Sequence, residues 1–186
     1  SFCDGLSIAA RSCAAKHLEA LKSFSESECT HLIVFEDDAL FLGKKPEALW
    51  ALVDKFVLLP EGKMLYLGGA DDPAEGLPHP MFPNLFVLAP GTTTEAYIVD
   101  RAAANHRLKW VRENRIDLPV DHFYQKFDDQ FGIIQLRPIR AIFTQGSVTG
   151  FFPTTLDLSR GRHSRVFLRI RFILRRCLVL AKEWFR

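Results

Sequence analysis

The chain has 186 residues, of which 48% are hydrophobic and 25% are charged. This composition is typical of a globular protein with one sizeable core, and the sequence contains no internal repeat and no low-complexity tract. The formal net charge of +2 conceals an asymmetry. From Arg160 onward, nine basic residues stand against one acid, Glu183, so this tail carries +8 and residues 1–159 carry −6.

The four cysteines form no C-x-x-C pair and show no paired spacing with histidine. We therefore expect neither a structural zinc site nor a disulfide framework, and this cysteine usage is typical of a reducing, cytoplasmic compartment. No secretory signal is visible, and no uninterrupted apolar stretch approaches the roughly 18 residues of a membrane-spanning helix. The chain starts at Ser1 rather than at methionine, which suggests a fragment or a trimmed product.

Hydrophobic periodicity predicts alternating helices and strands. Helices are expected at 6–24, at 46–59, at 101–114 and from Asp121 onward, where Asp128 and Asp129 are expected at an exposed helix end. Strands are expected at 31–35, 63–67, 85–89, 92–100, 132–138 and 140–145. Residues 70–84 are rich in proline and acid and predict a loop. The alternation predicts a three-layer α/β domain over residues 1–157, with a mostly parallel sheet.

An acidic cluster directly follows the first of these strands. Four apolar residues, Leu32 to Phe35, run into three carboxylates, Glu36, Asp37 and Asp38. Adjacent acids repel one another, so they must be solvated, hydrogen-bonded or bound to a cation. In open α/β sheets, ligands bind outside the carboxyl ends of the strands. The cluster therefore predicts a site for Mg²⁺ or Mn²⁺, which take carboxylates together with substrate phosphates. The alternative is a solvated acidic turn.

Several segments, in the same order, resemble glycosyltransferase family 25, whose members transfer a sugar, usually galactose, from a nucleotide sugar. "SCAAKHLEAL" keeps Cys13 and His17 of a Cys-x-x-Ser-His signature, with Lys16 in place of serine, and "VFEDDALF" is similar to a strand ending in L-E-D-D. Further similar segments are "MLYLGG", "TTTEAYIVDRAAANHRL", "LPVDHFY" and "RPIRAIFTQGS". The resemblance covers roughly residues 5–150. The family's opening I-N-L strand has no counterpart before residue 6.

The resemblance implies a nucleotide-sugar-binding, GT-A-like domain of Rossmann type without its first strand. It also implies a metal-dependent, inverting transfer of a hexose, expected to be galactose, from a UDP-sugar to a glycan or a lipid-linked acceptor. Mn²⁺ or Mg²⁺ held by Glu36 and Asp38 would neutralise the departing diphosphate. An inverting transfer needs a base beside the acceptor hydroxyl. Asp121 is the candidate for this base, and its alternative role is a helix N-cap.

Four further residues are candidates for binding the substrate. Asp37 either joins the metal or reaches the ribose of the donor. His17 and Tyr97 would line the donor pocket, and the alternative for both is packing in the core. Gln145 either faces the pyrophosphate or completes the last strand.

The basic tail, residues 158–186, predicts an amphipathic helix. Residues 164–186 interleave arginine with apolar residues at helical spacing, which suits an anionic membrane surface and a peripheral position on its cytoplasmic face. The alternative is a terminal helix packed on the domain. Eight net positive charges also attract nucleic acid, but the acidic body and the lack of a nucleic-acid motif argue against that partner.

Two other classes of protein are considered. A receiver-like signalling module also places acids after its first strand and binds Mg²⁺ there. Such a module needs a phosphoacceptor aspartate at the end of a later strand, where "KMLYLGG" has glycines instead. The other alternative is a non-catalytic relative that binds sugars or a partner, which the missing first strand favours.

Overall fold

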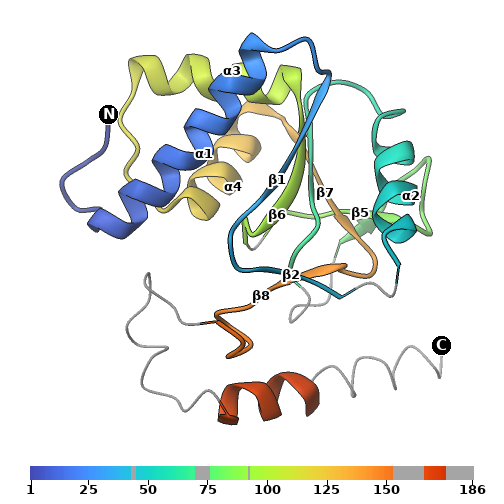
Figure 1. Ribbon diagram of the computed structural model, residues 1–186. Coiled ribbons are helices and arrows are strands. Elements are labelled where there is room, and N and C mark those ends of the chain that lie inside the picture. Colours follow the sequence, from blue (N-terminus) through green and yellow to red (C-terminus); the bar gives the residue numbers. More distant parts are fainter. Residues whose placement is uncertain (43–44, 70–75, 92, 153–165, 175–186) are drawn as a thin grey trace.

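A six-stranded sheet with helices on both faces forms the centre of the fold (Figure 1). The computed structural model describes residues 1–42, 45–69, 76–91, 93–152 and 166–174. The strand order is β1-β6-β3-β7-β5-β4. The strands are β1 (His31–Phe35), β3 (Lys63–Tyr66), β4 (Leu77–Pro78), β5 (Phe86–Leu88), β6 (Ala96–Asp100) and β7 (Ile134–Pro138).

The sheet is mixed, and the prediction of a mostly parallel sheet is wrong. β3 and β7 are parallel, whereas the pairs β1–β6, β6–β3, β7–β5 and β5–β4 are antiparallel. A parallel neighbour requires a crossover of a dozen or more residues, usually a helix. The alternation of helix and strand holds from β1 through α2 to β3, but β5 and β6 enter the sheet without intervening helices. β6 therefore inserts between β1 and β3 in the opposite direction.

Side chains alternate between two cores along the strands, as the pleat of a sheet requires. Met64 and Tyr66 of β3 face one core, and Leu65 of the same strand faces the other. The first core is covered by α1 (Ile8–Glu26), α3 (Arg101–Glu113) and α4 (Val120–Phe131), and the second by α2 (Glu47–Phe56). Figure 1 shows these helices on opposite sides of the sheet. The three layers and the mixed α/β class agree with the sequence.

Arg101 at the start of α3 connects two of these helices. Its guanidinium donates to the carbonyl oxygens of Phe24 and Ser25 in the last turn of α1, and also to those of Ser27 and Cys29 just beyond. The last carbonyls of a helix have no partner within the helix. α1 has no basic residue in its last turn, so Arg101 supplies the cation that this helix end favours.

A second, two-stranded sheet pairs β2 (Ala39–Phe41) with β8 (Phe143–Gln145). The sequence predicts β8 but not β2, because three residues are too few to show an alternating pattern. The two-residue strand β4 lies within the segment predicted as a loop. Residues 70–75 of that segment lie outside the described part of the chain.

Residues 166–174 form a further helix, within the predicted basic tail (Figure 1). The remaining residues of that prediction, 158–165 and 175–186, lie outside the described part. No helix of the described residues is long and apolar enough to cross a membrane.

Arg107 on α3 and Asp128 on α4 form a fully buried ion pair. Both side chains are 0% exposed, and the distance between Arg107 Nη2 and Asp128 Oδ2 is 2.6 Å. The guanidinium also lies 4.1 Å from the centre of the Tyr124 ring. The expected exposed position is therefore wrong for Asp128, although Asp129 is exposed. Asp128 follows Tyr124 by four residues and shares its buried face.

We expect Asp128→Asn and Arg107→Met each to lower the free energy of unfolding by about 3–5 kcal/mol, because each leaves a buried charge unpaired. The double variant Arg107→Met/Asp128→Leu should lose far less than the sum of the two single losses, since it leaves no buried charge. Urea unfolding measures these values, and Glu113→Gln on an exposed turn of α3 is the matched control. Single losses below about 1 kcal/mol would contradict a structural role for the pair.

Candidate functional site

The three acids occupy a tight turn between β1 and β2. The Ala39 N–H donates to the Glu36 carbonyl oxygen over 3.2 Å, which closes a four-residue turn. Aspartate is common in turns because its side chain can hydrogen-bond to nearby backbone. Asp37 is exposed, whereas Glu36 and Asp38 are half-buried. Contact with water is therefore enough to explain how the turn accommodates Asp37, whereas Glu36 and Asp38 need partners within the protein or a cation.

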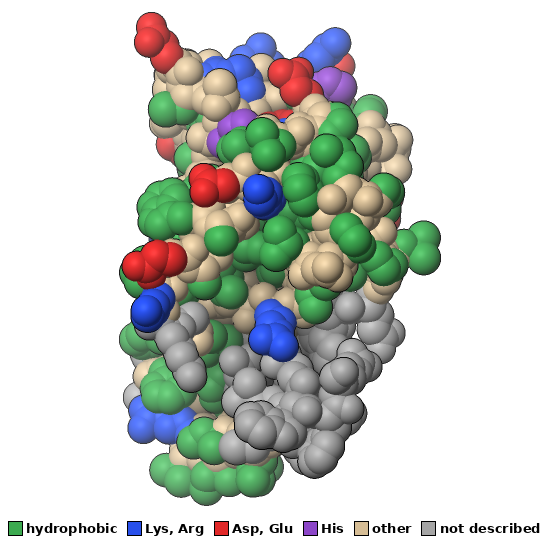
Figure 2. Space-filling view, turned by 90° about the vertical axis from the view of Figure 1, so that its right-hand side faces the viewer, with side chains coloured by type: hydrophobic (Ala, Val, Ile, Leu, Met, Phe, Trp, Pro, Cys, Tyr) green, Lys and Arg blue, Asp and Glu red, His purple; other side chains and the backbone are tan. Residues whose placement is uncertain are grey.

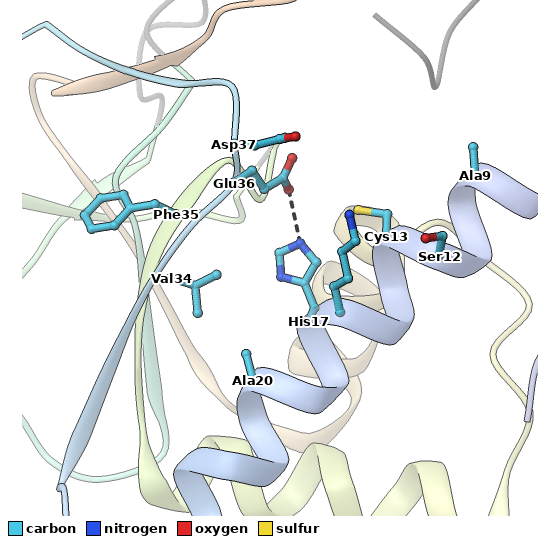
Figure 3. Close-up of a pocket in the computed structure, with 10 residues that line it drawn as sticks. Ala9, Ser12, Cys13, His17, Ala20, Val34, Phe35, Glu36 and Asp37 are labelled. Atoms are coloured by element: carbon cyan, nitrogen blue, oxygen red, sulfur yellow. Dashed lines mark hydrogen bonds and ion pairs between the residues drawn. The ribbon is translucent and has the colours of Figure 1, made fainter.

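The Glu36 carboxylate belongs to a chain of hydrogen bonds that crosses three elements, and Figure 3 shows the contact between Glu36 and His17 within it. Its Oε1 atom accepts from the Thr94 hydroxyl over 2.8 Å and lies 3.2 Å from His17 Nε2. On the other side of the ring, His17 Nδ1 lies 3.0 Å from the Tyr97 hydroxyl. His17 and Tyr97 are both buried. The chain therefore runs from α1 through the acidic turn to β6.

The register of β1 and β6 explains this meeting. Val34 lies opposite Tyr97, and the ladder continues beyond the strand, where the Glu36 N–H donates to the Glu95 carbonyl oxygen over 2.9 Å. Because side chains alternate along a strand, Glu36 and Val34 face the same side. That side is covered by α1, which carries His17.

Burial and hydrogen bonding act against each other on the Glu36 pKa. Burial is the largest single effect and raises it, but the hydrogen bonds from His17 and Thr94, together with the positive charges of His17 and Lys16, outweigh burial, so the pKa lies below its ordinary value. Glu36 is therefore ionised at neutral pH. The neighbouring Cys13 shows the opposite result, because burial and then the charges of Glu36 and Asp121 raise its pKa to about 11. Its thiol is protonated at neutral pH.

A pocket of about 410 Å³ opens between α1 and the carboxyl end of β1. Small-molecule sites have volumes of roughly 300–1,000 Å³. Figure 3 shows the Glu36 and His17 side chains pointing toward each other, with Asp37 beside Glu36. The pocket is lined by Ala9, Ser12, Cys13, Lys16, His17, Ala20, Val34, Phe35, Glu36 and Asp37.

Two kinds of metal ligand meet at this pocket. One ligand atom each from Cys13, His17 and Glu36 lie within 4.8 Å of one another. Thiolate and imidazole suit zinc, whereas carboxylates suit Mg²⁺ and Mn²⁺. The protonated Cys13 thiol is a poor ligand until it loses its proton. Glu36 Oε2, by contrast, has no hydrogen-bond partner among the described residues, so this oxygen is available to a cation.

Asp38 is held by the turn that follows β8. Its carbonyl oxygen accepts from the Gly146 N–H over 2.7 Å, and its Oδ2 atom accepts from the Ser147 N–H over 3.3 Å. A side chain at Gly146 would collide with the Phe152 ring and crowd this carbonyl, so glycine permits the approach. The other carboxylate oxygen, Oδ1, is buried and has no hydrogen-bond partner among the described residues.

Asp121 is not among the residues that line the pocket, and the structure removes its alternative role. Asp121 lies in the first turn of α4, whereas Pro119 occupies the N-cap position, so the N-cap alternative is wrong. Its Oδ1 atom accepts from the His122 N–H over 2.9 Å. The Asp121 charge contributes to the raised pKa of Cys13, so the two side chains are electrostatic neighbours.

The other predicted residues take different positions. His17, Glu36 and Asp37 line the pocket. Tyr97 packs in the core and contacts His17 through its hydroxyl, which corresponds to the core alternative, and it is not among the residues that line the pocket. Gln145 ends β8 opposite Ala39, and its carbonyl oxygen accepts from the N–H groups that follow it. This position corresponds to the strand-end alternative.

Two residues of the site are not among the sequence predictions. Thr94 donates to Glu36, and Glu95 is a buried carboxyl group whose Oε1 atom accepts from the Gly69 N–H over 2.9 Å. Burial raises the pKa of Glu95. A side chain at Gly68 would collide with this carboxyl group. The available signal was the single acid inside the otherwise uncharged run from 92 to 99.

Comparison with models of known protein families gave no match, and comparison with curated protein sequences gave none either.

The lowered pKa of Glu36 makes its contribution to stability dependent on pH. This contribution is complete above the pKa of the unfolded state, about 4.3, and is lost as the pH falls through the lower folded pKa. We therefore expect the free energy of unfolding to be higher for wild type than for Glu36→Gln at pH about 7 and at pH about 5. This difference should shrink as the pH falls below about 4. Urea unfolding at each pH tests this, with the exposed Glu19→Gln of α1 as control. A difference that grows in acid would mean that Glu36 is not held as a carboxylate.

Proposed function

We propose that this chain is a metal-dependent glycosyltransferase of the family-25 type, which transfers a hexose from a UDP-sugar. One observation carries the proposal. His17, Glu36 and Tyr97 come from three separate segments that bear the resemblance, and they form one hydrogen-bonded chain beside a pocket. Nothing in the spacing of these segments along the sequence requires them to meet. Their convergence supports a common role.

The position of the pocket in the fold also supports a nucleotide-sugar site. The pocket lies at the carboxyl end of β1, at one end of a sheet that has helices on both faces. This is the place where α/β domains bind their ligands. A GT-A-like, Rossmann-type arrangement of this mixed sheet is part of the proposal.

Two carboxylate oxygens of the acidic turn support the proposal of a site for a hard divalent cation. Glu36 Oε2 and Asp38 Oδ1 have no hydrogen-bond partner among the described residues, while the other oxygen of each carboxylate is held by the protein. The buried Asp38 Oδ1 atom costs free energy while it lacks a partner, and a bound cation would recover that cost. We propose that Glu36 and Asp38 hold Mn²⁺ or Mg²⁺. When bound, the cation would neutralise the charge that develops on the departing diphosphate.

The remaining roles follow from position and charge. His17 and Thr94 keep the Glu36 carboxylate ionised and fix its direction. Exposed Asp37 lines the pocket, where it reaches either the cation or a ribose hydroxyl. Asp121 is proposed as the base. It would take the proton of the acceptor hydroxyl as the new bond from oxygen to the sugar forms, while the bond between the sugar and the diphosphate breaks on the opposite face.

We expect UDP to bind the wild-type chain in the presence of Mn²⁺, with affinity at least about tenfold weaker, or about 1.4 kcal/mol, in Glu36→Gln and in Asp38→Asn. The reason is that each variant removes a negative ligand from the cation. Isothermal titration calorimetry with and without Mn²⁺ measures the affinities. Asp54→Asn, on an exposed turn of α2, is the matched control because it removes an acid far from the turn.

Two results would count against the proposal in different ways. Absence of UDP binding at any Mn²⁺ concentration would remove the nucleotide site altogether. Binding of UDP-galactose without any release of UDP, with or without added glycan acceptors, would favour the non-catalytic relative that binds sugars. In the transferase, Asp121→Asn should retain UDP binding and lose at least about a hundredfold in rate, because general base catalysis contributes about that much.

A further inference from the structure

The helix at residues 166–174 exposes an apolar face. Large aliphatic side chains are more than half exposed at four positions that follow the i, i+4, i+7, i+8 pattern of one helical stripe. These residues, which we call the tail face, are Val166 (65%), Ile170 (52%), Ile173 (54%) and Leu174 (60%). In Figure 2, hydrophobic side chains gather at the lower end of the molecule, where Figure 1 places this helix.

The opposite side of the same helix faces the protein. Leu168 and Phe172 are half-buried and lie four residues apart, on the side away from the tail face. Arg169 fixes this orientation, since its Nε donates to the Gly150 carbonyl oxygen over 3.2 Å and its guanidinium lies 5.0 Å from the centre of the Phe151 ring. The helix is thus attached by one side, and the exposed aliphatic side chains cannot turn inward without breaking these contacts.

The positive charge beside the tail face distinguishes between the possible partners of this face. Arg169 and Arg171 flank the tail face, and the sequence from residue 160 to 186 carries a net charge of +8. A second copy of the chain would bring another strongly positive tail against this one, which is unfavourable. Nucleic acid would satisfy the arginines but offers no apolar surface for four aliphatic side chains. A bilayer with anionic lipids offers both negative headgroups and hydrocarbon.

The sequence beyond the described helix repeats the same pattern. At helical spacing, the stripe of the tail face continues through Cys177, Leu178, Ala181 and Trp184. Tryptophan is enriched at the boundary between lipid and water. A stripe of this length with arginine and lysine beside it is typical of helices that lie in the plane of a membrane surface.

We infer that the tail face is a docking surface for an anionic lipid bilayer. The helix lies parallel to the membrane, with Ile170 and Ile173 among the acyl chains and Arg169 and Arg171 at the level of the phosphates. This inference does not depend on the proposed function.

Docking in this orientation has a consequence for the candidate site. The turn that holds Asp38 through Gly146 and Ser147 continues to Gly150, which accepts the Arg169 hydrogen bond. Figure 1 shows the helix at the same end of the molecule as the carboxyl end of β1. The docked helix therefore brings the acidic turn toward the lipid headgroups. If the proposed function also holds, this position favours a lipid-linked acceptor over a soluble glycan. Only this preference rests on the proposed function.

The test is co-sedimentation of the full chain with vesicles of phosphatidylcholine, alone or mixed with about one third phosphatidylglycerol, without nucleotide or metal. We expect binding to the anionic vesicles at least about tenfold tighter than to the neutral ones, falling steeply as salt is raised. Ile170→Ser/Ile173→Ser should weaken this binding at least about tenfold, since it removes buried aliphatic groups and leaves the charge unchanged. Leu58→Ser/Leu77→Ser is the matched control, because both leucines are exposed elsewhere on the surface.

Two alternative outcomes of the vesicle assay would overturn the inference. Equal binding of wild type and Ile170→Ser/Ile173→Ser would mean that charge alone attracts the tail, without insertion of the face. Absence of vesicle binding, with a dimer in sedimentation velocity that the serine variant dissociates, would assign the tail face to contact between copies. Circular dichroism of both serine variants confirms that they are folded. Because the assay contains no UDP or Mn²⁺, its failure is independent of the transferase proposal.

Discussion

The antiparallel register of β1 and β6 determines where the acidic turn can lie. With Val34 opposite Tyr97 and the Glu36 N–H bonded to the Glu95 carbonyl, Glu36 must face α1 and the Thr94 hydroxyl must lie beside it. A shift of one residue would turn Glu36 to the other side of the sheet and send its neighbour inward. The hydrogen bond to His17 and the wall of the pocket both follow from this pairing. The site is thus a consequence of strand registry rather than of the acidic cluster alone.

The core on the α1 side of the sheet contains further side chains that contact His17 and Tyr97. Tyr124 packs edge-on against both His17 and Tyr97, and its ring also contacts the Arg107 guanidinium, which pairs with buried Asp128. Polar groups of this kind are expensive to bury, and the pairing of Arg107 with Asp128 offsets part of that cost. The rings therefore connect the hydrogen-bonded chain at the pocket to an ion pair between α3 and α4. We interpret this continuous set of contacts as the support that keeps His17 in place.

Features that depend on local sequence patterns were predictable, whereas features that depend on a partner far away in the sequence were not. The apolar run before Glu36 predicts β1 with its observed bounds, and the residues that carry the family resemblance include His17 and Tyr97. The buried state of Asp128 was not predictable, because its partner lies on another helix and two adjacent aspartates normally indicate solvent. β2 was missed because its three residues show no alternating pattern and its assignment depends on pairing with β8, about a hundred residues away. The direction of β6 depends on a connection whose geometry no local pattern encodes.

The proposed function requires that the acidic turn hold a divalent cation for a nucleotide diphosphate. Its most direct test is a crystal of the full chain soaked with Mn²⁺ and UDP, with diffraction recorded at the manganese absorption edge. We expect an anomalous peak within bonding distance of the Glu36 carboxylate, with the diphosphate of UDP on the same ion. A peak bound elsewhere, or UDP bound without manganese at this turn, would contradict it.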